Sequence, residues 1–185
     1  MSKGPSTVIG DADFMFENTP VKIVINRNCP AIELAGLEVG PFKEGEEHEV
    51  RFWIAQELER AGIARLREEE SLDAVKLYKM HWKENVQPAT QISSLSEDFY
   101  SRLRRYLASL KRESIKRPEK MKEYEKATRL SRDIVNCRLK KIVSLASAPA
   151  QTDQTLNNLT REERVVYESL REIIDSWKFA IIKLK

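Results

Sequence analysis

The chain has 185 residues, of which 33% are charged and 41% hydrophobic, and its formal net charge is +3. This length accommodates a small domain joined to a medium one, and the apolar content suffices for a packed core. No stretch approaches the roughly 20 apolar residues of a membrane span, residues 1–19 lack a signal-peptide pattern, and the two cysteines lack CxxC spacing. We therefore expect a cytoplasmic or nuclear protein without a membrane segment or a disulfide framework.

Charge is divided unevenly along the chain. Residues 1–92 contain 11 basic and 16 acidic residues, whereas residues 93–185 contain 21 basic and 13 acidic residues. The first half is therefore acidic and the second half basic, which favours two domains with different surroundings.

The first part of the chain carries strand and turn signals. Apolar and polar residues alternate over residues 21–25, and the turn-prone segment 26–30 follows, which predicts a strand and its turn. Residues 31–37 can return as a second strand. The glycines and proline of residues 40–45 then break the chain, and residues 48–50 resume an extended pattern.

The periodicity changes from strand to helix near Phe52. Apolar residues then recur at three-to-four spacing, Gly62 is a suitable helix stop, and residues 63–66 predict a last short strand. The strand signal ends at the acidic run of residues 68–70. We therefore expect an N-terminal extension, a small β-rich (α+β) domain and an α-helical bundle domain, at residues 1–20, 21–67 and 71–185.

The remainder of the chain is helical in period, so the predicted fold class is mainly α. One face of a first helix, which must end before Pro88, is traced by Leu72, Val75, Tyr78 or Lys79, and Trp82. A second helix carries an apolar stripe made of Phe99, Leu103, Tyr106, Leu107 and Leu110.

Capping residues mark the predicted helix starts. Ser94 and Glu97 have the spacing of a capping box ahead of the second helix. Pro118 suits the first turn of a long third helix. Thr160 and Glu163 predict a capping box at the start of the final helix.

The final helix has two neighbouring apolar rows. Its second row, which contains Val166, Ile173 and Ala180, makes the apolar surface wider than a surface helix needs, so we expect burial on two sides. One side can belong to another protein chain, because soluble monomers rarely expose large apolar patches. Alternatively, this helix lies at the centre of a small bundle. The first row consists of Tyr167, Leu170, Ile174, Trp177, Ile181 and Leu184.

Motifs for catalysis or cofactor binding are missing from the sequence. His48 and His81 lie in different predicted domains without a companion ligand, which favours structural roles for both. Neither GxxxxGK[ST] nor GxGxxG occurs, and the acidic clusters lie in a predicted turn and linker. We expect no enzyme activity, no metal and no cofactor; an unfamiliar acidic active site in the β-rich domain is the competing hypothesis.

Basic residues cluster on or just after the second predicted helix. They favour contact with DNA or with an acidic partner. The aromatic residues of this helix lie on its apolar side rather than between the arginines, so base stacking is not indicated and a solvated or protein-binding face is favoured. The candidate residues are Arg102, Arg105, Lys111 and Arg112.

Two ordered sets of residues resemble a known family. The first set comprises residues 37–45, 49–50 and 52–55 with Leu58, Gly62, Ala64 and Leu66. The second set comprises residues 98–100, 132–134, 138, 141–143, 145–146, 159–160 and 162–163. Together they resemble archaeal-type subunits of the GINS complex, in the class whose small β domain precedes the helical domain. The resemblance covers about residues 20 to 184.

This resemblance implies a non-catalytic scaffold of the GINS DNA replication complex that links and stimulates the MCM replicative helicase. It implies a 2:2 heterotetramer with a paralogous subunit of opposite domain order, and contact with a RecJ-like protein in a nucleoid-associated replisome. Direct contact with DNA would be weak. The alternative function is a helical DNA-binding protein that uses its basic face.

Apolar residues supply the remaining candidates. Phe42 and Trp53 are expected to anchor the core of the β-rich domain, because aromatic residues beside a turn commonly do so; an exposed binding spot is the alternative. The candidates for the helical core or a subunit interface are Tyr167, Leu170, Ile174, Trp177, Ile181, Ile134 and Ile142.

Overall fold

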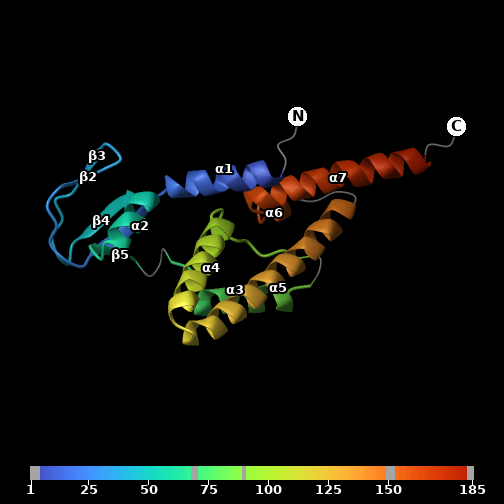
Figure 1. The fold of residues 1–185 in the computed structure, drawn as a ribbon. Helices are drawn as coiled ribbons and strands as arrows, with labels where there is room; N and C mark the ends of the chain where they lie inside the picture. Colours follow the sequence, from blue (N-terminus) through green and yellow to red (C-terminus); the bar gives the residue numbers. More distant parts are fainter. Residues whose placement is uncertain (1–4, 68–70, 89–90, 149–152, 183–185) are drawn as a thin grey trace. The chain divides into compact units, whose positions relative to one another are not determined.

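The computed structural model describes residues 5–67, 71–88, 91–148 and 153–182. The chain divides into two compact units, one spanning Asp13–Ser71 and one made of Met1–Ala12 with Leu72–Lys185. The fold is mainly α, with a small β-rich part followed by a helical bundle, as the sequence predicts (Figure 1). The predicted linker at residues 68–70 lies outside the described residues.

A three-stranded antiparallel sheet organises the β unit. Strand β1 (Pro20–Ile25) lies between β4 (Glu47–Arg51) and β5 (Ala64–Leu66), and helix α2 (Phe52–Arg60) follows β4 directly. The inward residues of β1 are fully buried, in agreement with the alternating pattern of the sequence. The predicted first and last strands and the helix near Phe52 are therefore confirmed.

Residues 31–37 do not form the single strand predicted from the sequence. They begin a hairpin in which β2 (Ile32–Leu34) pairs with β3 (Leu37–Val39). Ala35 and Gly36 connect the two strands with φ angles of 49° and 79°. Two consecutive positive φ angles suit the tight turn that joins twisted antiparallel strands, so the chain reverses here.

The N-terminal helix α1 (Pro5–Glu17) is predicted by no pattern in the sequence. Its residues from Asp13 onward belong to the β unit. The Phe16 ring is buried there and lies 4.5 Å from the Phe52 ring, centroid to centroid, whereas Phe14 is 69% exposed. Part of the predicted extension thus contributes to the hydrophobic core of the β unit.

The helical unit is built around its longest helix. Helix α5 (Glu119–Ser147) packs against α3 (Ala74–Val86), α4 (Phe99–Lys116) and α7 (Arg161–Ile182), and a short helix α6 (Asp153–Leu156) precedes α7 (Figure 1). One buried apolar cluster joins α3, α4 and α5, and another joins α5 and α7. The predicted long third helix and the final helix are confirmed.

Val75, Tyr78 and Trp82 lie on one face of α3, as the sequence predicts. This face is exposed, and the buried residues of the helix are Leu77 and Glu84. One detail of the predicted helices is wrong. Helix α4 begins after Asp98 rather than at a capping box formed by Ser94 and Glu97. The sequence pattern marks apolar positions correctly, but it does not show which face another element covers.

Candidate functional site

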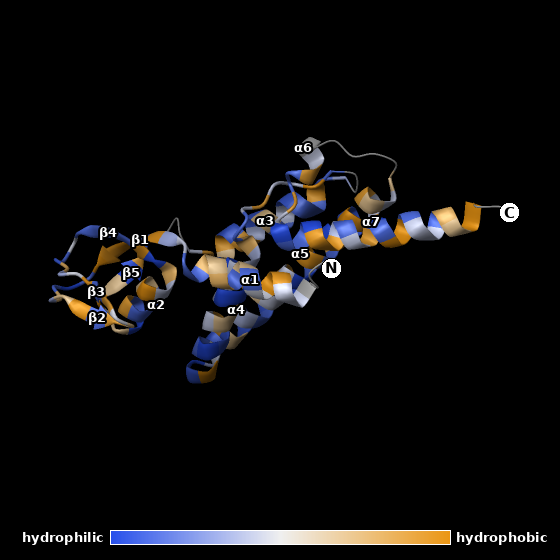
Figure 2. Cartoon of the chain, turned by 90° about the horizontal axis from the view of Figure 1, so that it is seen from above, coloured by the Kyte–Doolittle hydropathy of each residue, from blue (hydrophilic) through white to orange (hydrophobic). Residues whose placement is uncertain are grey.

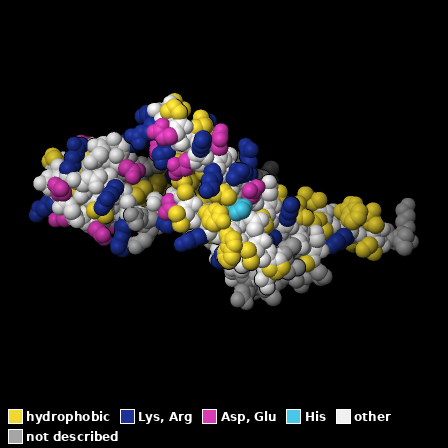
Figure 3. All heavy atoms as spheres, turned by 90° about the horizontal axis from the view of Figure 1, so that it is seen from below, with side chains coloured by type: hydrophobic (Ala, Val, Ile, Leu, Met, Phe, Trp, Pro, Cys, Tyr) yellow, Lys and Arg dark blue, Asp and Glu magenta, His cyan; other side chains and the backbone are white. Residues whose placement is uncertain are grey.

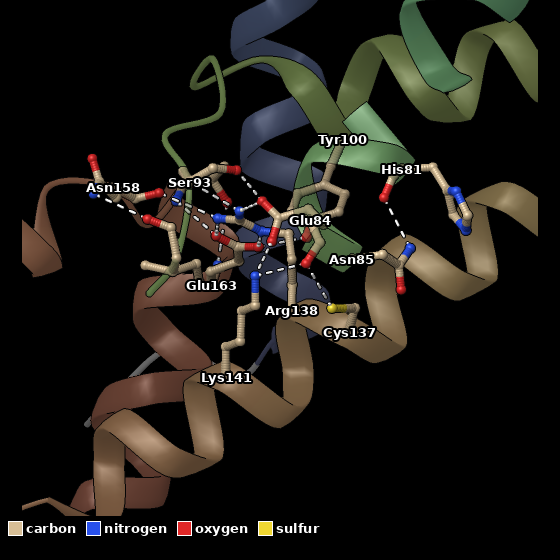
Figure 4. A network of polar contacts seen from close by, with 12 residues as sticks. His81, Glu84, Asn85, Ser93, Tyr100, Cys137, Arg138, Lys141, Asn158 and Glu163 are labelled. Carbon is tan, nitrogen blue, oxygen red and sulfur yellow. Dashed lines mark hydrogen bonds and ion pairs between the residues drawn. The ribbon is translucent and has the colours of Figure 1, made fainter. Parts of the chain in front are cut away.

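A network of buried charged side chains connects the elements of the helical unit (Figure 4). Its central residue is Arg138 of α5, whose guanidinium is fully buried. Arg138 lies on the same face of α5 as the core residues Ile134, Ile142 and Leu145. The helical period that buries those aliphatic side chains therefore buries a positive charge among them.

Arg138 donates hydrogen bonds to groups from four other segments. Its Nη1 atom lies 2.6 Å from Oε1 of Glu84 on α3 and 2.8 Å from the carbonyl oxygen of Ser93. Its Nε and Nη2 atoms lie 2.5 Å and 2.7 Å from the two carboxylate oxygens of Glu163 on α7. Nη2 also donates to the carbonyl oxygen of Asn158. One guanidinium thereby joins α3, α7 and the segments that precede α4 and α7.

Glu84 receives a second buried cation from α5. The Lys141 ammonium donates to Oε2 of Glu84 at 2.8 Å and to its carbonyl oxygen at 2.9 Å. The Ser93 hydroxyl also donates to the Glu84 carboxylate. The Cys137 thiol lies 3.3 Å from the Glu84 carbonyl oxygen. Buried charges are tolerated only when they are paired and hydrogen-bonded, and Glu84 meets both conditions.

Glu163 serves both the network and the start of α7. Its Oε2 atom accepts the backbone N–H of Thr160 at 3.1 Å, and its own N–H donates to the Thr160 hydroxyl at 3.4 Å. This is the capping box predicted from the sequence. The Tyr100 hydroxyl of α4 donates to Oε1 of Glu163 at 2.5 Å. The first turn of α7 is therefore fixed to α4 and α5.

The electrostatic environment favours the charged forms of Glu84 and Arg138. Burial raises the pKa of Glu84. Hydrogen bonds from Lys141 and Ser93 and the charges of Arg138 and Lys141 together lower this pKa by more than burial raises it, so the net pKa shift is downward. Burial lowers the pKa of Arg138, while the hydrogen bonds and charge of Glu163 raise it above its ordinary value. Burial, followed by the Glu163 carboxylate, raises the pKa of the Tyr100 hydroxyl.

An apolar cavity of about 250 Å³ lies beside this network. Val135 and Leu139 of α5 and Val166 of α7 contribute apolar walls, and Arg138 and Glu163 contribute polar edges. Within the described residues, no group of three or more histidine, cysteine or acidic side chains is placed to hold a metal ion. The network's donors and acceptors face one another, so its chemistry is that of a structural connection between helices.

The predicted interface or core residues separate along α7 and α5. Ile134, Ile142 and Tyr167 are buried, and Leu170 and Ile174 are partly buried against the cluster between α5 and α7. Trp177 and Ile181, farther along α7, are each 63% exposed. The apolar rows of α7 are thus covered at the start of the helix and uncovered at its end. Leu184 lies outside the described residues.

Helix α7 therefore ends in an exposed apolar surface, which we call the α7 end. Figure 2 shows hydrophobic segments recurring along α7 to its last described turn. Each side chain that belongs to the α7 end is at least 63% exposed. The α7 end consists of Ile173, Trp177, Phe179, Ile181 and Ile182.

The two predicted aromatic anchors lie in the β unit. Phe42 is buried in its core and forms an isolated β-bridge with Cys29. Trp53 is partly buried against the same core. Gly40, two residues before Phe42, has a φ angle of 102°, which suits glycine. A Cβ atom at this position would lie 3.3 Å from the Phe42 ring.

The predicted basic face is only partly available to a partner. Arg102 forms an ion pair with Asp98 at 2.6 Å and is partly buried, and Arg105 is partly buried as well. Lys111 and Arg112 are exposed. The structure therefore presents fewer available charges on α4 than the sequence cluster indicates.

The buried network was not predicted from the sequence, although the sequence contains a signal for it. Ile134, Arg138, Lys141 and Leu145 follow alternating spacings of four and three residues, which place two cations on the apolar face of a helix. Charges at such positions indicate buried partners. Their identities, Glu84 and Glu163, depend on which helices pack against α5.

Comparison with known families covers nearly the whole chain. Residues 66–182 match the family model of the GINS complex protein helical bundle domain, and residues 9–67 match that of the PSF2 N-terminal domain. No curated protein matches the chain. Among the described residues, no helix has both the length and the apolar character needed to cross a membrane.

Proposed function

Because this chain belongs to the GINS family of DNA replication complex subunits, we propose that it is a non-catalytic scaffold that links and stimulates the MCM helicase at the fork. Its β-rich part precedes its helical part, and its N-terminal residues match a PSF2 domain. We assign it to the archaeal-type class with this domain order. Its partners would be a paralogue of opposite order in a 2:2 heterotetramer, MCM and a RecJ-like protein.

The observation that carries this proposal is the α7 end. Five large apolar side chains there are uncovered on a helix whose first turn is fixed by the Arg138 network. Several exposed large apolar side chains gathered at one helix end are typical of subunit interfaces. Helix α7, fixed at its first turn and exposed at its end, therefore suits a subunit that binds other chains.

The proposal is tested by producing the chain alone and with its candidate paralogue, then measuring mass in solution. We expect a stable heterotetramer, and we expect Trp177→Lys to dissociate it. The matched control is Glu168→Lys, which places the same side chain on an exposed, polar position of α7. A wild-type chain that stays monomeric in the presence of the paralogue would refute the scaffold function.

The alternative function, DNA binding through the basic face, makes a different prediction. It requires tight binding by the chain alone, with affinity that falls steeply as salt increases. The ion pair of Arg102 and the partial burial of Arg105 reduce the charge available for phosphate contacts. We therefore expect weak binding, and Lys111→Glu with Arg112→Glu should remove what is present.

A further inference from the structure

The outward face of α3 carries a narrow apolar stripe, which we call the α3 stripe. Its four members, Val75, Tyr78, Trp82 and Val86, are between 54% and 62% exposed. Their spacings of three, four and four residues place them within about 80° of arc at 3.6 residues per turn. Figure 3 shows hydrophobic side chains gathered on a face of the helical unit beside a histidine.

The opposite face of α3 is firmly held. Leu77 is fully buried in the cluster of α3, α4 and α5, and Glu84 is fully buried in the Arg138 network. The Asp73 side chain caps the helix by accepting the Lys76 backbone N–H at 2.8 Å. The stripe is therefore presented on a helix whose position is fixed by its own core contacts.

One flank of the α3 stripe carries only positive charges. Lys79 and Lys83 are exposed along that flank, and the only acidic residue of α3, Glu84, is buried on the other side of the helix. On the opposite flank, His81 lies 3.6 Å from Asp133 of α5. A helix laid along the stripe would thus face ammonium groups on one edge and a mixed pair on the other.

We propose that the α3 stripe is a docking site for an amphipathic helix of a partner protein, with apolar residues at its centre and acidic residues along one flank. Apolar anchors supply the burial, and Trp82, the largest exposed member, is the expected hot spot. Pairing of the flanking carboxylates with Lys79 and Lys83 fixes the orientation and side of the partner helix. This site goes beyond the proposed scaffold function, which places the subunit interface at the α7 end and not at the α3 stripe.

Two synthetic helical peptides of equal length test the proposal, both with leucine at heptad positions a and d. One has glutamate at positions e and g and the other has lysine there, and like charges keep each from pairing with itself. Each peptide, fluorescently labelled, is titrated with the full chain and with the complex containing its paralogue. We expect the glutamate peptide to bind at least about tenfold more tightly, with affinity that falls as salt increases.

Variants locate the binding. Trp82→Ser should weaken binding of the glutamate peptide by about tenfold or more, whereas Phe14→Ser, at a similarly exposed aromatic residue of α1, should leave it unchanged. Lys79→Glu with Lys83→Glu should reverse the preference toward the lysine peptide, which a merely unfolded variant could not do. Circular dichroism checks that each variant keeps its helical content.

Several outcomes would overturn the proposal. These are no binding of either peptide, equal binding of both, or binding that the α3 variants do not change. Dissociation of the paralogue complex by Trp82→Ser would assign the stripe to subunit assembly instead. The mass of the wild-type complex tests the scaffold function separately, so failure of one proposal is distinguishable from failure of the other.

Discussion

Arg138 places a positive charge where water does not reach it, and its environment determines whether this is tolerable. Removing a charge from water costs several kcal/mol, which only close opposite charges and hydrogen bonds can offset. Glu84 and Glu163 supply both from two different helices. Such an arrangement contributes less to stability than its contact distances suggest, but it is very sensitive to loss of one partner.

We therefore predict that Arg138→Met destabilises the helical unit by about 3–5 kcal/mol, because two buried carboxylates lose their shared cation. Urea denaturation followed by circular dichroism measures the change. The control is Lys140→Met on the exposed face of α5, which should change stability by less than about 0.5 kcal/mol. Adding Glu84→Gln and Glu163→Gln to Arg138→Met should restore part of the loss; a purely additive result would contradict the coupling.

The lowered pKa of Glu84 gives the helical unit an acid-sensitive component. A carboxyl group whose pKa is lower in the folded than in the unfolded state stabilises the fold at pH values above its unfolded-state pKa, which is 4.5 for Glu84. This stabilisation is lost as the pH falls through the pKa of the folded state. We predict that the free energy of unfolding falls below about pH 4.5 and that Glu84→Gln flattens this dependence. Glu125→Gln, at an exposed position of α5, should leave the dependence as in the wild type.

At the scale of elements, predictability follows from how long a pattern persists. Helix α5 repeats its period over 29 residues and was predicted, whereas β2 and β3 have three residues each and cannot be distinguished from one strand. Helix α1 lacks one continuous buried stripe, since Phe14 and Met15 are exposed and Phe16 is buried. Its helical state is not recognisable from period alone, because its packing depends on Phe52 of another element.

Helix α1 provides a matched pair of aromatic residues for a stability test. We predict that Phe16→Ala destabilises the β unit by about 3–5 kcal/mol, because it leaves a cavity beside Phe52. Phe14→Ala, two residues earlier and mostly exposed, should have little effect. Hydrogen exchange of the β1 amides reports on this unit directly. Equal exchange in both variants would show that α1 does not stabilise the sheet.

At the scale of the whole molecule, each unit has its own hydrophobic core. The core of the β unit includes Phe16, Ile23 and Leu58, and the clusters of the helical unit share no residue with it. We predict two unfolding transitions in calorimetry, with Phe16→Ala lowering one and Arg138→Met lowering the other. A single transition shifted by both variants would contradict independent unfolding.

The candidate surfaces were predicted less completely than the fold, for a physical reason. Apolar periodicity predicted a wide apolar surface on the last helix, and the α7 end shows that surface uncovered. The same periodicity in α3 did not indicate that Val75 and Trp82 point away from the core. Which apolar face is covered depends on long-range packing, and the Arg138 network needs partners that lie more than 20 residues away in the sequence.

The capping box at Thr160 also affects how α7 behaves over its length of about 33 Å. Its first turn is held by Glu163, but the side chains of the α7 end find little cover within the chain. Short helical segments without tertiary support are only marginally stable in water. The last turns of α7 would then fray in the free chain and become fully ordered when a subunit covers them. Assembly would include a coil-to-helix transition, visible as a gain of helical ellipticity and a more negative heat capacity of association.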